Sequence, residues 1–253
     1  MLTFIFCGLL VTSLVVMKGL SWGARGGEVV PLGPFAFSPL ICVSSWARVV
    51  EPESGELRRI ALKMVLALVG LVVFYGLYQQ VGLTEAVRPW IPLIWSYLAV
   101  PIALLLGEFA GPFTQLCCAV GGNIIPDYHM SPLRSASLSE FWGARWNVWV
   151  SDWYRQMIFG PLRRQPGWAL FSTFLFSGLW HETLINVPYF VVKGQVLFGT
   201  QLGYFLIQYV GMLAERGLPR NARVLRRAYV WLVVVGPVPL FLNRSMLEMM
   251  RLG

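Results

Sequence analysis

Charged side chains are scarce in this sequence. Only 13% of the 253 residues are Asp, Glu, Lys or Arg, whereas a soluble domain carries about 25%. Hydrophobic residues make up 57%, and the mean hydropathy is +0.63. A water-soluble fold of this length would leave much of the apolar excess exposed. The composition therefore excludes an ordinary soluble domain and indicates a membrane protein.

Metal-type cysteine spacing and a cleavable leader are also missing. The four cysteines, with Cys117 and Cys118 adjacent, cannot chelate as C-x-x-C pairs do. We read them as small hydrophobic residues of the membrane, with a redox or lipidation role as the alternative, and predict no metal or cofactor. Residues 1–17 have neither a basic start nor a small-residue cleavage site. We expect them to form a retained first span, with further spans upstream left open.

Acidic residues are fewer than basic ones: the sequence has 12 Asp and Glu and 20 Lys and Arg, which gives a net charge of +8. On a soluble protein this balance would suggest nucleic acid. Here the basic residues lie between apolar runs, where the positive-inside rule places them. Anionic lipid headgroups or an anionic cosubstrate are therefore the expected partners, and no nucleic acid is expected.

Long apolar runs are what the chain has in abundance. A spanning helix needs about 20 mainly apolar residues, and six segments are predicted as spans: 1–17, 61–83, 90–106, 168–192, 196–213 and 228–242. Residues 109–120 either continue the third helix after a kink at Gly111-Pro112 or form a re-entrant piece. The predicted fold is an all-α polytopic transmembrane bundle of about six spans, with seven as the alternative, in a single domain over 1–253.

The distribution of arginine supports six spans. Three loops hold most of it: 18–60 (Arg25, Arg48, Arg58, Arg59), 121–167 (Arg134, Arg145, Arg155, Arg163, Arg164) and 214–227 (Arg216, Arg220, Arg223, Arg226, Arg227). With six spans these loops share one face, predicted to be cytoplasmic, and the links 84–89 and 193–195 are short. A separate span at 109–120 would break this agreement. We expect a bacterial inner membrane or the endoplasmic reticulum.

Within the second basic loop, residues 139–158 have helical periodicity. A stripe with spacings of three and four contains Trp142, Trp146, Trp149, Val150, Trp153 and Met157. This pattern predicts an amphipathic helix at the membrane interface, with Ser139 as its N-cap and Gly160-Pro161 as its end. The plain alternative is a helix that only anchors the loop. Asn147 does not fit that alternative, because an amide is not needed for anchoring and is disfavoured inside a helix.

His181 and Glu182 lie inside the apolar run 168–192. A histidine at this depth is costly unless it faces protein or a water-filled cavity, so it indicates function; the alternative is a histidine that bonds a neighbouring helix. Neutral imidazole suits proton acceptance near pH 7. Glu182 points about 100° away around the helix and is not expected to share the same proton. Gly178, one turn earlier, would leave room for a substrate chain.

At these motifs the chain resembles the wax-synthase branch of the membrane-bound O-acyltransferases. The resemblance rests on SLSEFWGARWN (137–147), SDWYRQMIFGPLRR (151–164) and FLFSGLWHE (174–182), which are similar to the family's FWGRRWN and SGLxHE patterns in order and separation. It covers residues 130–230 well. The resemblance implies transfer of a fatty acyl group from an acyl thioester, usually acyl-CoA, to an alcohol within the membrane.

The resemblance also implies roles for individual residues. His181 matches the family's catalytic histidine and Asn147 its second polar position. His181 would take the hydroxyl proton while Asn147 positions a reactant or stabilises the oxyanion. Arginines of the loop could attract CoA phosphates. The residues predicted to bind substrate are Trp142, Arg145, Trp146, Asp152, Arg155, Arg163 and Glu182.

Two other classes of protein stay open. One is a non-catalytic membrane scaffold or subunit, and the other is a lipid transporter with broken helices. A transporter predicts inverted repeats, which the sequence does not show. Within acyl transfer, the acceptor could be a long-chain alcohol, a sterol, diacylglycerol, a lysolipid or a polyketide-type hydroxyl.

Overall fold

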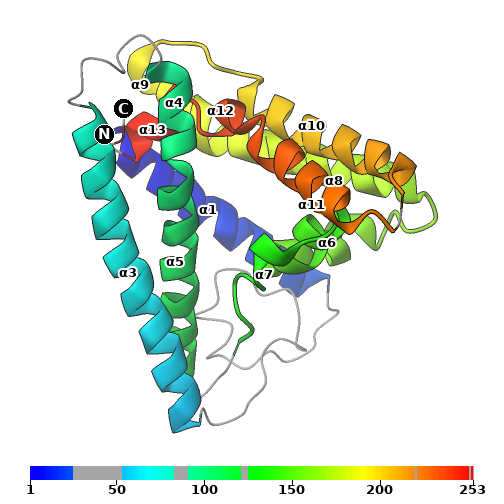
Figure 1. Ribbon diagram of the computed structural model, residues 1–253, viewed down its shortest axis with the longest axis horizontal. Coiled ribbons are helices and arrows are strands. Elements are labelled where there is room, and N and C mark those ends of the chain that lie inside the picture. The colour runs from blue at the N-terminus through cyan, green and yellow to red at the C-terminus, as the bar shows by residue number, and fades with distance from the viewer. Residues whose placement is uncertain (25–52, 83–90, 121–124, 220, 251, 253) are drawn as a thin grey trace.

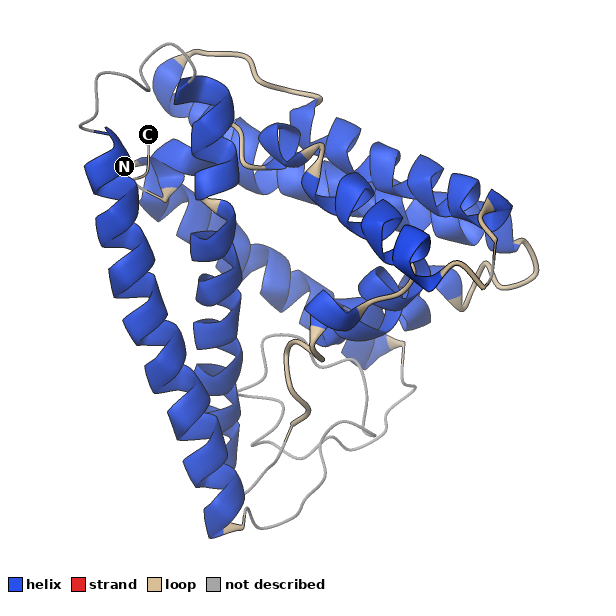
Figure 2. Ribbon diagram, in the orientation of Figure 1, coloured by secondary structure: helices blue, strands red, loops and turns tan. Residues whose placement is uncertain are grey.

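The computed structural model describes residues 1–24, 53–82, 91–120, 125–219, 221–250 and 252. Within these residues all regular structure is helical, as predicted (Figure 2). The longer helices are α1 (Leu2–Gly23), α3 (Ser54–Gly82), α5 (Val100–Val120), α8 (Pro166–His181), α10 (Thr200–Ala214) and α11 (Arg223–Val235). The shorter ones are α4 (Ile91–Leu98), α6 (Leu138–Glu140), α7 (Val148–Tyr154), α9 (Val187–Lys193), α12 (Val238–Phe241) and α13 (Arg244–Met249).

Four helical segments in the described ranges are long and apolar enough to cross a membrane: Leu2–Ser21, Gly55–Gln80, Ile94–Val120 and Arg223–Phe241. They correspond to the predicted spans at 1–17, 61–83, 90–106 and 228–242. The predicted span at 168–192 is helical and the one at 196–213 is helical from Thr200 onward, but both fall outside these four. Polar Glu182 and Asn186 interrupt the first with a π-helical turn, and α10 has only 15 residues.

Residues 109–120 continue the third helix. The helix α5 runs through Pro112 to Val120, so a separate span and a re-entrant piece at this place are both wrong. Proline removes one backbone hydrogen bond without ending the helix. Figure 1 shows α5 beside α3 along most of its length. Gly70 of α3 lies against Leu105, where an added Cβ would be 3.1 Å from the leucine methyl groups.

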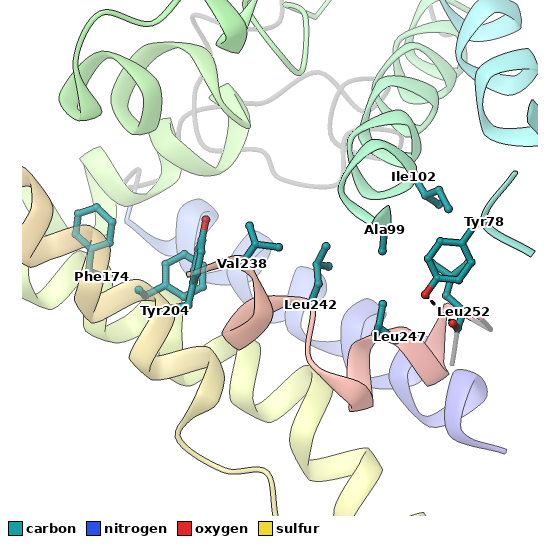
Figure 3. Packing of buried hydrophobic residues seen from close by; sticks show 10 residues of the cluster. Tyr78, Ala99, Ile102, Phe174, Tyr204, Val238, Leu242, Leu247 and Leu252 are labelled. Atoms are coloured by element: carbon teal, nitrogen blue, oxygen red, sulfur yellow. Dashed lines mark hydrogen bonds between the residues drawn. The ribbon is translucent and has the colours of Figure 1, made fainter. Parts of the chain in front are cut away.

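The helices α8 and α10 form a second antiparallel pair, set obliquely to α3 and α5 (Figure 1). Phe171 near the start of α8 contacts Tyr209 near the end of α10, with ring centroids 5.4 Å apart. A buried cluster joins the two pairs. Figure 3 shows it extending from Phe174 and Tyr204 through Val238 and Leu242 to Tyr78. The Tyr78 hydroxyl donates a hydrogen bond of 2.7 Å to the Leu252 carbonyl.

The single amphipathic helix predicted over 139–158 is wrong. The chain forms α6, a π-helical turn over Phe141–Arg145, α7 and a second π-helical turn over Arg155–Phe159. A break at Asn147, whose φ is 40°, separates the two halves. The N-cap is Ser137, not Ser139, and its side chain accepts a hydrogen bond from the Glu140 amide. The predicted end at Gly160 is confirmed.

The tryptophan stripe of this segment packs inside the protein. Trp149 and Trp153 are both 2% exposed. Their indole N–H groups donate to the carbonyls of Pro126 and Met17, at 3.0 and 3.1 Å. An interfacial tryptophan would keep its polar edge near lipid headgroups. The stripe therefore joins this segment to α1 and to the chain before α6.

Ion pairs and hydrogen bonds link residues of the three arginine-rich loops 18–60, 121–167 and 214–227. Lys63 and Arg59 of α3 bond the Asp127 carboxylate at 2.7 and 3.2 Å. Glu215, at the end of α10, accepts from the Leu138 amide at 3.0 Å and pairs with Arg226. Arg25, Arg48, Arg220 and the link 84–89 lie outside the described residues.

Candidate functional site

His181 is the last residue of α8, directly before the π-helical turn Glu182–Asn186. Its Nδ1 lies 2.7 Å from the carbonyl oxygen of Ser177, one turn earlier. A carbonyl oxygen only accepts, so Nδ1 carries the hydrogen, and the lone pair of a neutral ring lies on Nε2. Within the described part of the chain, Nε2 makes no hydrogen bond. The ring is thus fixed in the tautomer that a general base needs.

Aromatic rings surround the imidazole. Its ring centroid lies 4.7 Å from that of Phe205 on α10, 5.3 Å from Phe241 on α12 and 5.4 Å from Trp180. Buried apolar walls strengthen electrostatic interactions and exclude water. The imidazole therefore has the surroundings expected of a group that handles a proton next to a lipid chain.

The two sequence motifs converge at this aromatic wall. Trp142, from FWGARWN, lies with its ring 6.0 Å from Phe205 and 6.1 Å from Phe174. Its indole N–H donates to Gln208 of α10 at 3.2 Å. Phe205 consequently touches both Trp142 and His181. On the other side of α8, Tyr154 of α7 contacts Phe176 with centroids 5.9 Å apart.

Asn147 occupies the break between the two halves of the first motif. Its left-handed backbone conformation is one that asparagine tolerates better than most residues. Its side-chain oxygen accepts from the Val150 amide at 3.3 Å and caps α7. No hydrogen bond joins Asn147 to His181 in the described residues. The joint action of these two side chains on a substrate therefore stays a prediction.

Arg145 is held within the protein. It pairs with Glu140 at 2.6 Å and donates to the Met130 carbonyl at 2.9 Å. A hydrogen bond from the Ala136 amide lowers the pKa of Glu140 below its usual value, and Arg145 adds to this effect. Because its donors are occupied, Arg145 stabilises the turn around Asn147 in this structure.

The other predicted charged residues fall into two groups. Arg155 pairs with Asp152 and donates to the Gly143 carbonyl at 2.7 Å. The side chains of Arg163 and its neighbour Arg164 are exposed and form no ion pair or hydrogen bond in the described chain. These two guanidinium groups are therefore free to meet an anionic ligand.

Glu182 makes no hydrogen bond to His181 in the described residues and is buried in a polar network. Its carboxylate accepts from Asn186 Nδ2 at 2.6 Å and from the Leu202 amide at 3.0 Å. Asn243 and Ser245 complete the network around Asn186. The network ties the π-helical turn after His181 to α10 and α13.

The expected room beside Gly178 for a substrate chain is not there. An added Cβ at Gly178 would lie 2.8 Å from Leu202 Cδ1 and 2.9 Å from Leu202 Cα. The glycine instead allows the backbones of α8 and α10 to approach closely. This close approach brings Phe205, one turn beyond Leu202, against His181.

One polar residue beside the site was not predicted. His129 stacks on Trp146 with ring centroids 4.4 Å apart, next to Asn147, and its Nδ1 lies 2.9 Å from Glu108 Oε1. The available signal was a second histidine in DYHMSPLRS, shortly before the first motif. Among the described residues, no group of three or more His, Cys, Asp or Glu side chains could hold a metal ion.

Comparison with known proteins reaches the same residues. The model of the membrane bound O-acyl transferase family matches residues 125–198, which include both motifs and His129. The resemblance to the wax-synthase branch of membrane-bound O-acyltransferases is confirmed. "Probable long-chain-alcohol O-fatty-acyltransferase 9" of Arabidopsis thaliana is 28% identical over 222 residues, covering 78% of this chain and 62% of that protein.

Two further relatives show the range of this membrane-bound O-acyltransferase resemblance. "Probable long-chain-alcohol O-fatty-acyltransferase 3" of Arabidopsis thaliana is 25% identical over 79% of this chain and 59% of that protein. "Diacylglycerol O-acyltransferase 1" of Dictyostelium discoideum is 29% identical over 42% of this chain and 17% of that protein. The chain spans less than two thirds of the length of these relatives.

Proposed function

We propose that this protein is a membrane-embedded O-acyltransferase that moves a fatty acyl group from acyl-CoA, or another acyl thioester, to a hydroxyl acceptor such as a long-chain alcohol. The observation that carries the proposal is the orientation of His181. Its Nδ1–H is bound to the Ser177 carbonyl, which leaves Nε2 as the basic nitrogen inside an aromatic wall. The names of the relatives support the same chemistry.

In the proposed reaction, the acceptor oxygen attacks the thioester carbonyl carbon while His181 Nε2 takes the hydroxyl proton. Asn147 Nδ2, whose hydrogens are not used in the cap of α7, donates to the oxyanion or positions a reactant. The tetrahedral intermediate collapses, the carbon–sulfur bond breaks, and the imidazolium returns the proton to the thiolate. The products are an ester and free CoA, with no covalent enzyme intermediate.

Substrate binding follows from the same arrangement. Trp142 and Trp146 would line the acyl or acceptor path, and Arg163 would bind CoA phosphates, because its guanidinium has no partner in the described protein. Arg145, Asp152, Arg155 and Glu182 would act by holding the turns on which the site is built. We further propose six membrane crossings, with the basic loops on the cytoplasmic face of a bacterial inner membrane or the endoplasmic reticulum.

The test uses membranes from a host without neutral-lipid synthesis. Labelled acyl-CoA is supplied with a long-chain alcohol, diacylglycerol, a sterol or a lysolipid, at matched expression of each variant. We expect a labelled ester from at least one acceptor and a loss of about 10²- to 10⁴-fold in His181→Ala, since that is what a general base contributes.

Thr183→Ala is the matched control, because Thr183 is exposed two residues after His181 and bonds only the Leu179 carbonyl. It should retain the wild-type rate. No ester from any acceptor, with folded and inserted protein, would contradict the proposal. That result would favour the scaffold or the lipid transporter instead.

A further inference from the structure

The segment that precedes α6 is fitted closely against α5. An added Cβ at Gly111 would lie 2.5 Å from Tyr128 Cβ, and one at Gly107 would lie 2.8 Å from His129 Cε1. Such distances leave no space for any larger side chain. The two glycines of α5 therefore allow Tyr128 and His129 to pack directly on the helix, one turn apart.

His129 is buried between a carboxylate and an indole. Its side chain is 2% exposed, and Nδ1 lies 2.9 Å from Glu108 Oε1 of α5. The ring stacks on Trp146 with an interplanar angle of 26°. Nε2 is buried and has no hydrogen-bond partner in the described residues. A half-satisfied buried imidazole costs free energy that an apolar residue would avoid, so packing alone does not account for a histidine here.

Backbone hydrogen bonds place this cluster around Asn147. The Met130 amide donates to the Arg145 carbonyl at 2.8 Å, and the Val148 amide donates to the Tyr128 carbonyl at 2.9 Å. The two bonds join the segment around His129 to the segment around Asn147. Their partners lie directly before and after His129 in the first segment, and directly before Trp146 and after Asn147 in the second. Asn147 has a positive φ, which persists only when its surroundings hold it.

We propose that Glu108 and His129 are positioning residues for Asn147. Glu108 fixes the orientation of the imidazole, the imidazole fixes the Trp146 ring, and Trp146 with the two backbone hydrogen bonds holds the Asn147 turn toward the substrate. Neither residue touches the reacting atoms. The inference rests on the proposed function where it assigns Asn147 a part in acyl transfer. That Glu108 and His129 hold the turn at Asn147 does not depend on the proposed function.

The first arm of the test measures structure and needs no substrate. Amide hydrogen exchange of the purified full chain is compared for wild type, His129→Ala, Glu108→Gln and the control Thr114→Ala. Thr114 is a half-buried residue of α5 whose hydroxyl bonds only the Ala110 carbonyl. We expect exchange at 145–150 to rise at least tenfold in His129→Ala and less in Glu108→Gln. Exchange at 174–186, around His181, should stay as in wild type and in the control.

The second arm measures catalysis with the acceptor that gives an ester. In His129→Ala we expect kcat to fall by an order of magnitude, with the KM for acyl-CoA within twofold of wild type. When His129→Ala is added to Asn147→Ala, the residual rate should fall no further, because the histidine acts through the asparagine. Additive losses would be expected of a residue that only stabilises the fold.

The outcomes separate the two proposals. Unchanged exchange at 145–150, a rise shared by 174–186, or an unchanged kcat in an active enzyme would overturn the positioning role. If the wild type makes no ester, the proposed function fails, but the exchange measurement still tests the positioning role. Faster exchange confined to 145–150 would mean that Glu108 and His129 hold the turn, and unchanged exchange would overturn this role.

Discussion

Gly178 and Leu202 bring the backbones of α8 and α10 together at the level of the candidate site. A Cβ on Gly178 would lie 2.9 Å from Leu202 Cα, a backbone atom that cannot turn aside as a flexible side chain can. The Leu202 amide also donates to Glu182 on the same face. The position of α10, and with it the Phe205 ring against His181, therefore depends on the absence of a side chain at residue 178.

Gly178→Ala should separate α8 from α10. Overpacking of this kind costs about 1–3 kcal/mol, so we expect a lower Tm and a large loss of ester formation. Gly203→Ala is the matched control, because Gly203 lies in α10 and an added Cβ there would meet only Leu240 Cδ1 at 3.8 Å. Wild-type Tm and activity in Gly178→Ala would show that α10 can shift without harm. Thermal unfolding in detergent and the ester assay provide both readings.

Substitutions of Asn147 should separate its backbone role from its chemical role. Asn147→Gly keeps the positive φ and costs only a few tenths of a kcal/mol as an N-cap, whereas Asn147→Ala strains the backbone and loses the cap, at about 1–3 kcal/mol. We expect Asn147→Gly to keep a Tm close to that of wild type and to lose most of the acyl transfer. Asn147→Ala should lose both. Full activity in Asn147→Gly would mean that the amide takes no part in the reaction.

Hydropathy predicted four segments that are long and apolar enough to cross a membrane, because apolar runs such as 61–83 are continuous and exposed on most sides. Val72 of α3, for example, is 66% exposed. Periodicity failed over 139–158, because the tryptophan spacing of three and four continues across the break at Asn147. Spacing records only which residues could share a helix face. The one local signal was asparagine itself, which tolerates a left-handed backbone.

The sequence predicted the residues of the candidate site that stand in local motifs, but not the contacts between distant segments. The histidine and the asparagine stand in motifs, and motifs can be recognised. The contacts of Phe205 with Trp142 and His181 join three separate segments, and the pair Glu108–His129 joins a helix to a loop 21 residues later. The space beside Gly178 was misjudged because a glycine does not reveal whether a substrate or a helix fills it.

Arg163 and Arg164 should affect the binding of the acyl donor and not the chemical step. Both are exposed and their side chains are unpaired in the described chain, and exposed contacts between opposite charges contribute about 0.2–1 kcal/mol each. In the double variant Arg163→Ala/Arg164→Ala we expect a rise in the KM for acyl-CoA on the order of tenfold, with kcat unchanged. Salt should reduce the difference from wild type by screening exposed charges.

The control for this pair is Arg216→Ala, an exposed arginine after α10 with no ion pair in the described residues. Initial rates are measured against acyl-CoA concentration at low and high ionic strength. An equal rise of KM in Arg216→Ala would indicate a general effect of net charge. An unchanged KM in the double variant would remove these arginines from the donor site.

Asp127 should make the stability of the protein depend on pH. Burial alone would raise the pKa of this carboxyl group, but hydrogen bonds from Lys63 and Gln115 and the charge of Lys63 outweigh that effect, and the pKa lies below its ordinary value. A carboxyl with a depressed pKa contributes stability above its unfolded-state pKa of about 3.9 and loses it as the pH falls through the folded-state value.

We therefore expect Asp127→Asn to lower the Tm at pH 7, because Lys63 and Arg59 lose a charged partner. The Tm of wild type should fall as the solution is acidified below about pH 5, and it should approach that of Asp127→Asn as the pH falls through the lowered folded-state pKa, below which both side chains are neutral. Glu56→Gln, which removes a carboxylate from the same end of α3, should retain the wild-type slope. Parallel Tm curves for wild type and Asp127→Asn across this range would show that the carboxylate contributes nothing to holding α3 against the segment that leads to Asn147.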